Sequence, residues 1–429
     1  MADVQPLRAL RHDLERAGPL ARLISPPYDV LDAQQRADLA ARSPYNAVHL
    51  DLPQAPEPDG DPYLHAALLL DGWRDQGAVV QDDEPSLLVL EQEFDAPGGG
   101  RRTRRGVHAR VRVQPYGPGG VRPHERTHPG PKEDRLRLTR ATKANVSPIF
   151  VLHDDPEGTV TDALQRAIDA TPLYASATDD EGTEQRLHRI TDPDLLAAVC
   201  APFADRELLI ADGHHRYETA RVYADEQGAQ DGPHRFVLAH LVALQDPGLA
   251  VFPTHRLLDD LKDPVTQERL GTALKELFDV TPLHSTDELR PPDGQGPLTL
   301  GYLDRHFNQP FRLVLKDQAR ADAALRDKPA AFRHLDTAVL EALVLRDVLG
   351  MTEDDVAHLN GLGYSRTDRE AVELITSGRY DCGFFLRASP VEQVREVAAT
   401  GEVMPPKSTF FHPKVPSGLT FNPLAYSRA

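Results

Sequence analysis

The segment 207–228, ELLIADGHHRYETARVYADEQG, constrains the fold of this chain more than any other stretch. Its apolar run ends at Ala211, Asp212-Gly213 form a turn signal, and a helical pattern begins near His214. The sequence therefore predicts a strand, a tight turn and a helix, with several ionisable side chains gathered at the turn.

The other patterns along the chain are a mixture of short strands and helices without a strict βαβ repeat, which indicates an α+β fold. At 429 residues the chain exceeds the usual size of one hydrophobic core, so two or three domains are expected. The pattern of expected strands and helices changes near residue 260, which predicts a core at 1–260 and a smaller α+β region at 261–429. Helices are expected at about 32–41, 159–170, 335–350 and 390–401 and in a segment that ends at Trp73; strands at 46–52, 147–155, 236–244, 249–258 and 380–389; and hairpins at 86–116 and 297–317.

Composition restricts the classes of partner. The net charge is 48 − 66 = −18, and such a negative field argues against a dedicated nucleic-acid-binding protein. It does not argue against a small anionic substrate, because local arginines can override the global field at contact distance. Four arginines of the first hairpin are expected in a solvated tip: Arg101, Arg102, Arg104 and Arg105.

The remaining composition suggests a cytoplasmic protein. The two cysteines, Cys200 and Cys382, lie far apart, which excludes a disulfide framework and a thiolate zinc site. The first residues have no apolar signal region, and no apolar run approaches the length of a membrane span. No membrane partner is therefore expected.

The turn 212–216 has the residues of an anion site. His214 and His215 are neighbours, so on a helix their side chains diverge by about 100° and cannot easily share one metal ion. The start of a helix offers backbone N–H groups and a positive dipole end, Gly213 permits a close approach, and Arg216 is a forked donor. Asp212 is open to three roles: helix N-cap, Mg²⁺ ligand or proton acceptor.

A second polar segment, RPHERTHPGPKEDRL at 122–136, contains the zinc-peptidase pattern H-E-x-x-H. That pattern works only on a continuous helix, and Pro123 before it and Pro129 and Pro131 after it leave room for one turn at most. No zinc is therefore expected. The segment is interpreted as a loop with groups that handle anions: His124, Glu125, Arg126, His128, Lys132 and Arg135.

A third segment, MPPKSTFFHPKVPSG, lies near the C-terminus. Its Lys407-Ser408-Thr409 is similar to the end of a phosphate loop, but the glycines of that motif are absent. Lys407, Ser408 and Lys414 in this proline-bounded loop either close over an anion or belong to a tail that packs on the core.

Several of these segments in order resemble the bacterial domain of unknown function 1015 family. They are SPPYDV, HERTHPGPKEDRL, SPIF, ADGHHRYETA, PTHRL and MPPKSTFFHPK. The central D-G-H-H-R also resembles free serine kinases built on the ParB/sulfiredoxin-like fold. The resemblance implies that Asp212, His214, His215 and Arg216 form a phosphate-binding turn in a mixed-sheet core, while a separate carboxylate activates the serine hydroxyl. Glu125 is the first choice for this carboxylate because it lies among cations, and Asp29 is the second.

These readings together predict a small-molecule kinase, a phosphotransferase with an alcohol group as acceptor. It would transfer a phosphoryl group from ATP, ADP or pyrophosphate to free L-serine or a related hydroxy acid, with Mg²⁺, for which Asp212 is a possible ligand. The alternative is a non-catalytic nucleotide or phosphometabolite sensor of the same fold. A sulfiredoxin-like or nuclease activity is a third reading, weakened because histidine stands where a sulfiredoxin needs cysteine at the turn. A homodimer is possible, and the C-terminal loop is expected to close on the site.

Overall fold

The computed structural model describes residues 2–96, 99–127, 129–294 and 296–425. Strands in which apolar and polar residues alternate contribute to its larger sheet. In β5 (Arg101–Arg112), Val107, Ala109 and Val111 belong to an apolar core. Arg104 and His108 alternate with them and therefore point to the opposite face of the sheet.

The chain divides into two units. Unit 1 comprises Met1–Pro123, Thr127–Ala250 and Pro413–Ala429, and unit 2 comprises His124–Arg126 and Val251–His412. The sequence-based boundary near residue 260 falls inside unit 2. The last segment, which the sequence assigns to the C-terminal region, belongs to unit 1.

Unit 1 is built on a mixed sheet with the order β6-β11-β8-β12-β5-β4-β10-β9, and β1 pairs with β5. The pairs β11–β6 and β12–β8 are parallel, whereas the other pairs along this order are antiparallel. The strands are β1 (Val4–Gln5), β4 (Leu87–Asp95), β5, β6 (Val121–Arg122), β8 (Ile149–His153), β9 (Ala175–Thr178), β10 (Glu184–Ile190), β11 (Leu208–Asp212) and β12 (Phe236–Ala243).

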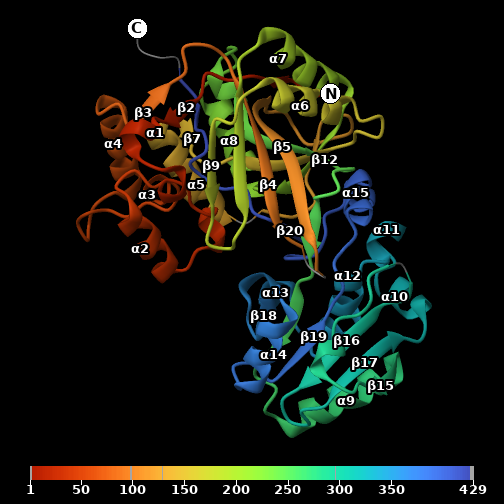
Figure 1. The fold of residues 1–429 in the computed structure, drawn as a ribbon. Coiled ribbons are helices and arrows are strands. Elements are labelled where there is room, and N and C mark those ends of the chain that lie inside the picture. The colour runs from red at the N-terminus through yellow and green to blue at the C-terminus, as the bar shows by residue number, and fades with distance from the viewer. Residues whose placement is uncertain (1, 97–98, 128, 295, 426–429) are drawn as a thin grey trace. The chain divides into compact units, whose positions relative to one another are not determined.

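One face of this sheet is covered by helices (Figure 1). Apolar residues of α6 (Thr159–Ala170), α7 (Pro193–Cys200) and α8 (His214–Glu226) share one buried cluster with the strands. A second cluster joins α4 and α5 to the small pairs β2–β3 and β7–β21. The further elements of unit 1 are α1 (Leu14–Ala17), η1 (Leu20–Arg22), η2 (Tyr28–Val30), α2 (Ala33–Arg42), α3 (Val48–Asp51), α4 (Pro62–Asp75), α5 (Pro129–Thr142), η3 (Ala201–Asp205), η4 (Pro233–Arg235), β2 (Leu10–His12), β3 (Val79–Gln81), β7 (Ala144–Asn145) and β21 (Asn422–Pro423).

The opposite face of the sheet combines buried apolar side chains with buried polar ones, among them Gln92 and Arg104, and the C-terminal segment 413–424 crosses it. Arg104, fully buried, donates to the carbonyl oxygen of Pro413 at 2.6 Å, and Gln92 Nε2 donates to that of Lys414 at 3.1 Å. These contacts fix the C-terminal segment against the strands, so its side chains reach the edge of the sheet where β11 ends.

Unit 2 contains an antiparallel sheet with the order β15-β17-β16-β19-β14-β18, against which α14 packs. Its elements are β13 (Ala250–Phe252), β14 (His255–Leu258), α9 (Pro264–Leu277), β15 (Phe278–Pro282), η5 (Thr286–Glu288), β16 (Thr299–Asp304), β17 (Pro310–Leu315), α10 (Gln318–Ala324), α11 (Ala330–Arg333), α12 (Asp336–Leu340), η6 (Glu341–Arg346), α13 (Glu353–His358), β18 (Leu362–Ser365), α14 (Asp368–Thr376), β19 (Cys382–Phe385), α15 (Val391–Ala399) and β20 (Phe410–His412).

Three local expectations are wrong. The expected strand at 46–52 contains the helix α3, and Asn46, just before this helix, accepts the N–H of Val48. The segment 122–136 is not a loop throughout, since its second half forms α5, whose first turn tolerates prolines that lack an N–H. Arg104 is not in a solvated tip, because it lies within β5 and is fully buried.

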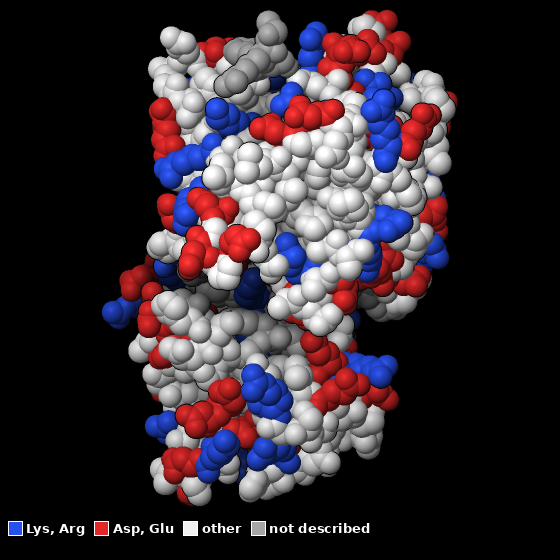
Figure 2. Space-filling view, turned by 90° about the vertical axis from the view of Figure 1, so that its left-hand side faces the viewer, with Lys and Arg blue, Asp and Glu red and all other residues white. Residues whose placement is uncertain are grey.

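Charges of both signs are interspersed over the face of the molecule drawn in Figure 2. Blue side chains do not merge there into one continuous basic surface. Among the helices of the described ranges, none combines the length and the apolar character needed to cross a bilayer.

Candidate functional site

The turn after β11 has the conformation that its sequence predicts. β11 ends at Asp212, Gly213 adopts φ +91°, and α8 begins at His214. A Cβ atom at Gly213 would lie 3.0 Å from Ile149 and 3.1 Å from the guanidinium of Arg216. Glycine is therefore required twice, for the left-handed backbone and for the close approach of Arg216.

Asp212 receives donors on both carboxylate oxygens. Oδ1 accepts the N–H of Gly213 at 2.8 Å, and Oδ2 accepts the ammonium of Lys414 at 3.0 Å. Arg216 lies 3.8 Å from the same Oδ2. Burial by itself raises the pKa of Asp212, but Lys414 and Arg216 outweigh burial and hold the pKa far below its ordinary value. Asp212 is therefore a carboxylate with two cationic neighbours.

Arg216 lies in the first turn of α8, and its side chain is 9% exposed. It donates through Nη1 to the carbonyl oxygen of Pro148, while its Nε–H is buried and has no hydrogen-bond acceptor in the described part of the chain. Burial lowers the pKa of this guanidinium, but Asp212, Asp29 and Asp51 raise it above the ordinary value. Three carboxylates thus lie within electrostatic range of one arginine.

The two histidines of the turn lie in different environments. His214 is buried, and its electrostatic influence helps to lower the pKa of Asp212, whereas His215 is half-buried. In the described ranges no group of three or more histidine, cysteine, aspartate or glutamate side chains could hold a metal ion. Neither histidine is thus part of a preformed metal cluster of that kind.

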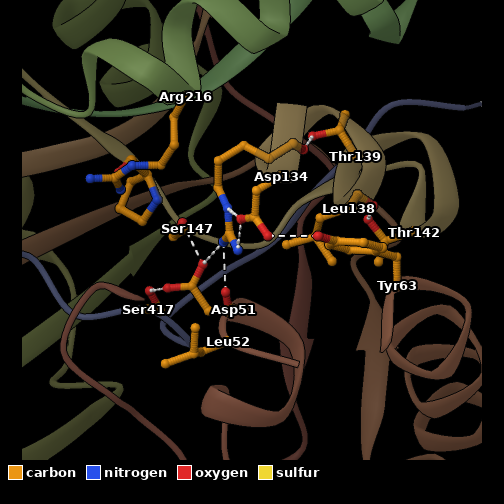
Figure 3. Close-up of polar contacts among 12 residues, drawn as sticks. Asp51, Leu52, Tyr63, Asp134, Leu138, Thr139, Thr142, Ser147, Arg216 and Ser417 are labelled. Carbon is orange, nitrogen blue, oxygen red and sulfur yellow. Dashed lines mark hydrogen bonds and ion pairs between the residues drawn. The ribbon is translucent and has the colours of Figure 1, made fainter. Parts of the chain in front are cut away.

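Asp51 lies at the centre of a buried polar network beside the turn (Figure 3). Its Oδ1 accepts the hydroxyl of Ser147 at 3.0 Å, and its Oδ2 accepts that of Ser417 at 2.7 Å. Arg135 Nη1 donates to the carbonyl oxygen of Asp51 at 2.6 Å, and Arg135 Nε donates to Asp134 at 2.7 Å. Because every one of these side chains is satisfied, the network holds α3, α5 and the C-terminal segment together.

The SPPYDV segment brings Tyr28 and Asp29 to this network. The guanidinium of Arg135 lies 3.9 Å from the centre of the Tyr28 ring. Burial, assisted by Asp29, raises the pKa of Tyr28 to about 12, so the phenol stays protonated near neutral pH. Asp29 itself is exposed. It is thus a solvent-facing carboxylate within electrostatic range of Arg216.

Other predicted residues lie in unit 2. Glu125 Oε1 accepts the N–H of Lys407 at 3.1 Å, and Lys407 has φ +55° and an exposed side chain. His124 is buried with Nε2 3.0 Å from the hydroxyl oxygen of Thr409, and Ser408 is buried and donates to the carbonyl oxygen of Pro405 at 2.6 Å. The structure therefore groups the HER and KST segments with each other.

The remaining predicted site residues are divided between the two units. Arg126 is exposed in unit 2, whereas Lys132 and Arg135 lie on α5 of unit 1. His128 lies outside the described residues. The segment 123–127 is not helical, so its part of the H-E-x-x-H pattern lacks the helix that zinc binding by this motif needs.

Sequence reasoning missed Asp51, Ser147 and Ser417. Asp51 was placed in an expected strand, and the two serines, although they lie in the quoted segments SPIF and MPPKSTFFHPKVPSG, were given no role. Tyr28 belongs to a quoted motif but was not given a role. Only the proximity of residues that are far apart in the chain reveals this network, and one sequence carries no signal for such proximity.

Comparison with known proteins identifies the family. No curated protein matches the sequence. Among solved structures, a conserved hypothetical protein from Pyrococcus furiosus is 17% identical, with a TM-score of 0.35, and the match covers 69% of this chain and 89% of that chain. A free serine kinase variant in complex with AMP is 15% identical, with a TM-score of 0.36, and covers 68% and 83%. The protein SbnI from Staphylococcus aureus, truncated at its C-terminus, is 11% identical, with a TM-score of 0.34, and covers 68% and 79%.

At these identities and TM-scores the structural likenesses do not establish a shared activity. The sequence itself is decisive for the family, because residues 4–338 match the model of a family described as "Protein of unknown function (DUF1015)". The chain therefore belongs to the DUF1015 family.

Proposed function

We propose that this protein is a small-molecule kinase that transfers a phosphoryl group to the hydroxyl of free L-serine or a related hydroxy acid. The observation that carries this proposal is the arrangement at the start of α8, where Arg216 and Lys414 flank Asp212. Phosphoryl transfer requires cations that neutralise the transferred group and a carboxylate that orients the hydroxyl, and unit 1 supplies both. We further assign the mixed sheet of unit 1 to the ParB/sulfiredoxin-like fold.

In this proposal the terminal phosphate of the donor binds at the first turn of α8. Arg216, Lys414 and the two histidines stabilise its charge, assisted by the positive end of the helix. The acceptor oxygen forms a bond to the terminal phosphorus as the bond between that phosphorus and the donor's bridging oxygen breaks. The hydroxyl proton passes to a carboxylate, and the donor leaves as ADP, AMP or orthophosphate when it enters as ATP, ADP or pyrophosphate.

Asp29 is our choice for the carboxylate that accepts the proton. It is exposed, belongs to the same unit as Asp212 and lies within electrostatic range of Arg216. Glu125, the other candidate, belongs to unit 2 and uses one oxygen to hold the backbone of Lys407. We assign His124 and Ser408, both buried and hydrogen-bonded, to holding that loop, and the exposed Lys407 and Arg126 to contacts with anions.

Magnesium fits this site only as an ion that arrives with the donor. Mg²⁺ in phosphoryl transfer is commonly held by one or two carboxylates plus the substrate's phosphates. Asp212 supplies one such carboxylate, provided that Lys414 moves from its Oδ2. When bound, the ion would neutralise charge on the donor phosphates.

Phosphorus NMR tests the proposal. The protein is incubated with L-serine and, separately, ATP, ADP or pyrophosphate, each with and without Mg²⁺. We expect a phosphomonoester signal coupled to the serine methylene protons with at least one donor, and its loss in Asp212→Asn. Absence of transfer from all three donors to serine and to related hydroxy acids would overturn the kinase proposal.

A second candidate function is a non-catalytic sensor of nucleotides or phosphometabolites. It is favoured by the ion pair of Asp212 with Lys414, which leaves neither carboxylate oxygen without a donor. A sensor would bind a donor in the same NMR samples, seen as line broadening, without consuming it.

A further inference from the structure

A small pocket in unit 1 is lined in part by Arg216. Its volume is about 30 Å³. It is bordered by α5, α8, β12 and the segment 144–147. The lining residues are Arg135, Leu138, Thr139, Ala144, Asn145, Val146, Ser147, Arg216, Thr219 and Val237.

Among the described residues that line the pocket, one buried hydrogen-bond donor has no acceptor. This is Nε–H of Arg216, whose side chain is more than nine-tenths buried. An arginine N–H that is buried without a partner costs free energy, so the structure favours an occupant that accepts a hydrogen bond here.

The hydroxyl groups of the pocket already use their hydrogens elsewhere. Thr139 donates to the carbonyl oxygen of Arg135 at 2.9 Å, Ser147 donates to Asp51 at 3.0 Å, and Thr219 donates to the carbonyl oxygen of Lys132 at 3.3 Å. Their oxygens can therefore only accept a further hydrogen bond. An occupant must accept from Arg216 and donate to a lining oxygen, which describes a hydroxyl group and excludes a fully ionised phosphate.

Size leads to the same class of ligand. Because one water needs about 10–15 Å³ of such volume, this pocket has room for about two non-hydrogen atoms. A methylene carbon with its hydroxyl oxygen fits, whereas a phosphate with five such atoms does not.

We propose that this pocket receives the CH₂OH group of a primary alcohol and so selects the acceptor. This inference rests on the proposed kinase function, and it adds that Arg216 contacts the acceptor hydroxyl through Nε and the donor phosphate through its terminal nitrogens. Thr139, Ser147 and Thr219 then determine specificity for a hydroxyl over a methyl group.

The chain offers a matched pair of variants for the test (Figure 3). Thr139 and Thr142 both lie on α5 and both donate to the carbonyl oxygen four residues earlier, at 2.9 and 2.8 Å. Thr139 lines the pocket, whereas Thr142 is not among the lining residues. Valine has nearly the shape of threonine, so Thr139→Val removes the acceptor oxygen without opening space, and Thr142→Val reports the loss of the helix contact alone.

Two measurements are made on the full-length protein. The first is the ratio of the affinities for L-serine and L-alanine by calorimetry without a phosphoryl donor. The second is the KM for L-serine with the best donor. Thr139→Val should lower the affinity ratio by about tenfold and raise the KM by a similar factor, with the KM for the donor unchanged, because one hydrogen bond to the hydroxyl is lost. Thr142→Val should change neither.

The outcomes separate this inference from the proposed function. Preference for serine over alanine that Thr139→Val removes, in a protein that transfers no phosphate, would sustain the pocket and overturn the kinase. Transfer with an unchanged ratio and KM in both Thr139→Val and Thr219→Val would show that the pocket holds an internal water only, and would overturn the inference. Thr219→Val serves as the second variant in case Thr139→Val fails to fold.

Discussion

At Asp212, two cations from different parts of the chain stabilise one carboxylate. Arg216 is four residues away, whereas Lys414 is 202 residues away and reaches Asp212 because the C-terminal segment crosses the sheet. Asp212→Asn should lower transfer about 100-fold or more, since it removes the anchor of the site. It should also destabilise the fold by about 1–3 kcal/mol, because it removes the carboxylate that pairs with Lys414 and lies beside Arg216.

A double variant separates these two effects. Lys414→Met in the Asp212→Asn background removes the cation that pairs with Asp212 in the wild type, and it should recover part of the free energy of unfolding measured in urea. Transfer should not recover. If the double variant regained activity together with stability, Asp212 would be a structural ion-pair partner only.

The identity of the proton-accepting carboxylate gives a second test at this scale. Asp29→Asn should lower the turnover rate about 100-fold and leave the melting temperature unchanged, since Asp29 is exposed. Glu125→Gln keeps an oxygen that accepts the N–H of Lys407, so its turnover should change by only a few-fold. Steady-state rates of the two variants decide the assignment. The reverse pattern would move the base to Glu125.

At the scale of elements, the turn between β11 and α8 depends on Gly213. Gly213→Ala would place a Cβ atom against Ile149 and the Arg216 guanidinium at φ +91°. Gly228, just beyond α8, has φ +95°, and no atom lies within 4 Å of the position that an alanine methyl would take there, so Gly228→Ala carries the backbone strain alone. Both variants should lose about 1 kcal/mol of unfolding free energy from backbone strain.

Only Gly213→Ala should also displace Arg216. We expect it to weaken phosphate binding about tenfold or more, measured by calorimetry, with Gly228→Ala close to the wild type. Equal phosphate affinity in both variants would show that Arg216 does not contact the anion.

Elements with strong local signals were predicted correctly. The helix expected at 32–41 is α2, with Asp32 as its cap, and the helix expected at 159–170 is α6. The hairpins β4–β5 and β16–β17 were also expected, since alternation and turn residues are local properties.

Elements whose formation depends on tertiary contacts were not predicted from the sequence. No element was predicted in the polar stretch 176–192, yet β10 forms there because β4 offers a strand edge with which it pairs, and β9 pairs with β10 in turn. The same division holds at the site. The sequence identified the turn 212–216, whose geometry is local, but could not bring Asp51, Ser147 and Ser417 together.

At the scale of the whole molecule, unit 1 contains an unusual group of buried histidines. His108 and His240 face each other across β5 and β12 with ring centres 4.9 Å apart, and both are fully buried. His240 has no hydrogen-bond partner on either ring nitrogen in the described ranges. His12 and His153 are also buried, and all four belong to unit 1.

These histidines predict how stability depends on pH. Burial lowers the pKa of His108 to about 3 and those of His12 and His153 to about 4, and it lowers the pKa of His240 well below its ordinary value of 6.5. Between pH 4 and 6.5 the unfolded chain therefore binds protons that the folded chain does not. The free energy of unfolding is highest above pH 6.5 and falls as the pH drops, by roughly 1 kcal/mol per pH unit for each histidine.

Urea unfolding of the full-length protein at a series of pH values from 7.5 to 4.5 measures this slope. Replacing the facing pair by apolar side chains of similar size, His108→Leu with His240→Leu, removes two of the five histidines whose pKa burial lowers, the others being His12, His49 and His153. The slope of the variant should therefore be smaller than that of the wild type by roughly two fifths. His215→Leu serves as the control, since His215 is half-buried and not part of this group. If the slope of the double variant equalled that of the wild type, other groups would govern the acid lability, because only residues protonated differently in the two states contribute to it.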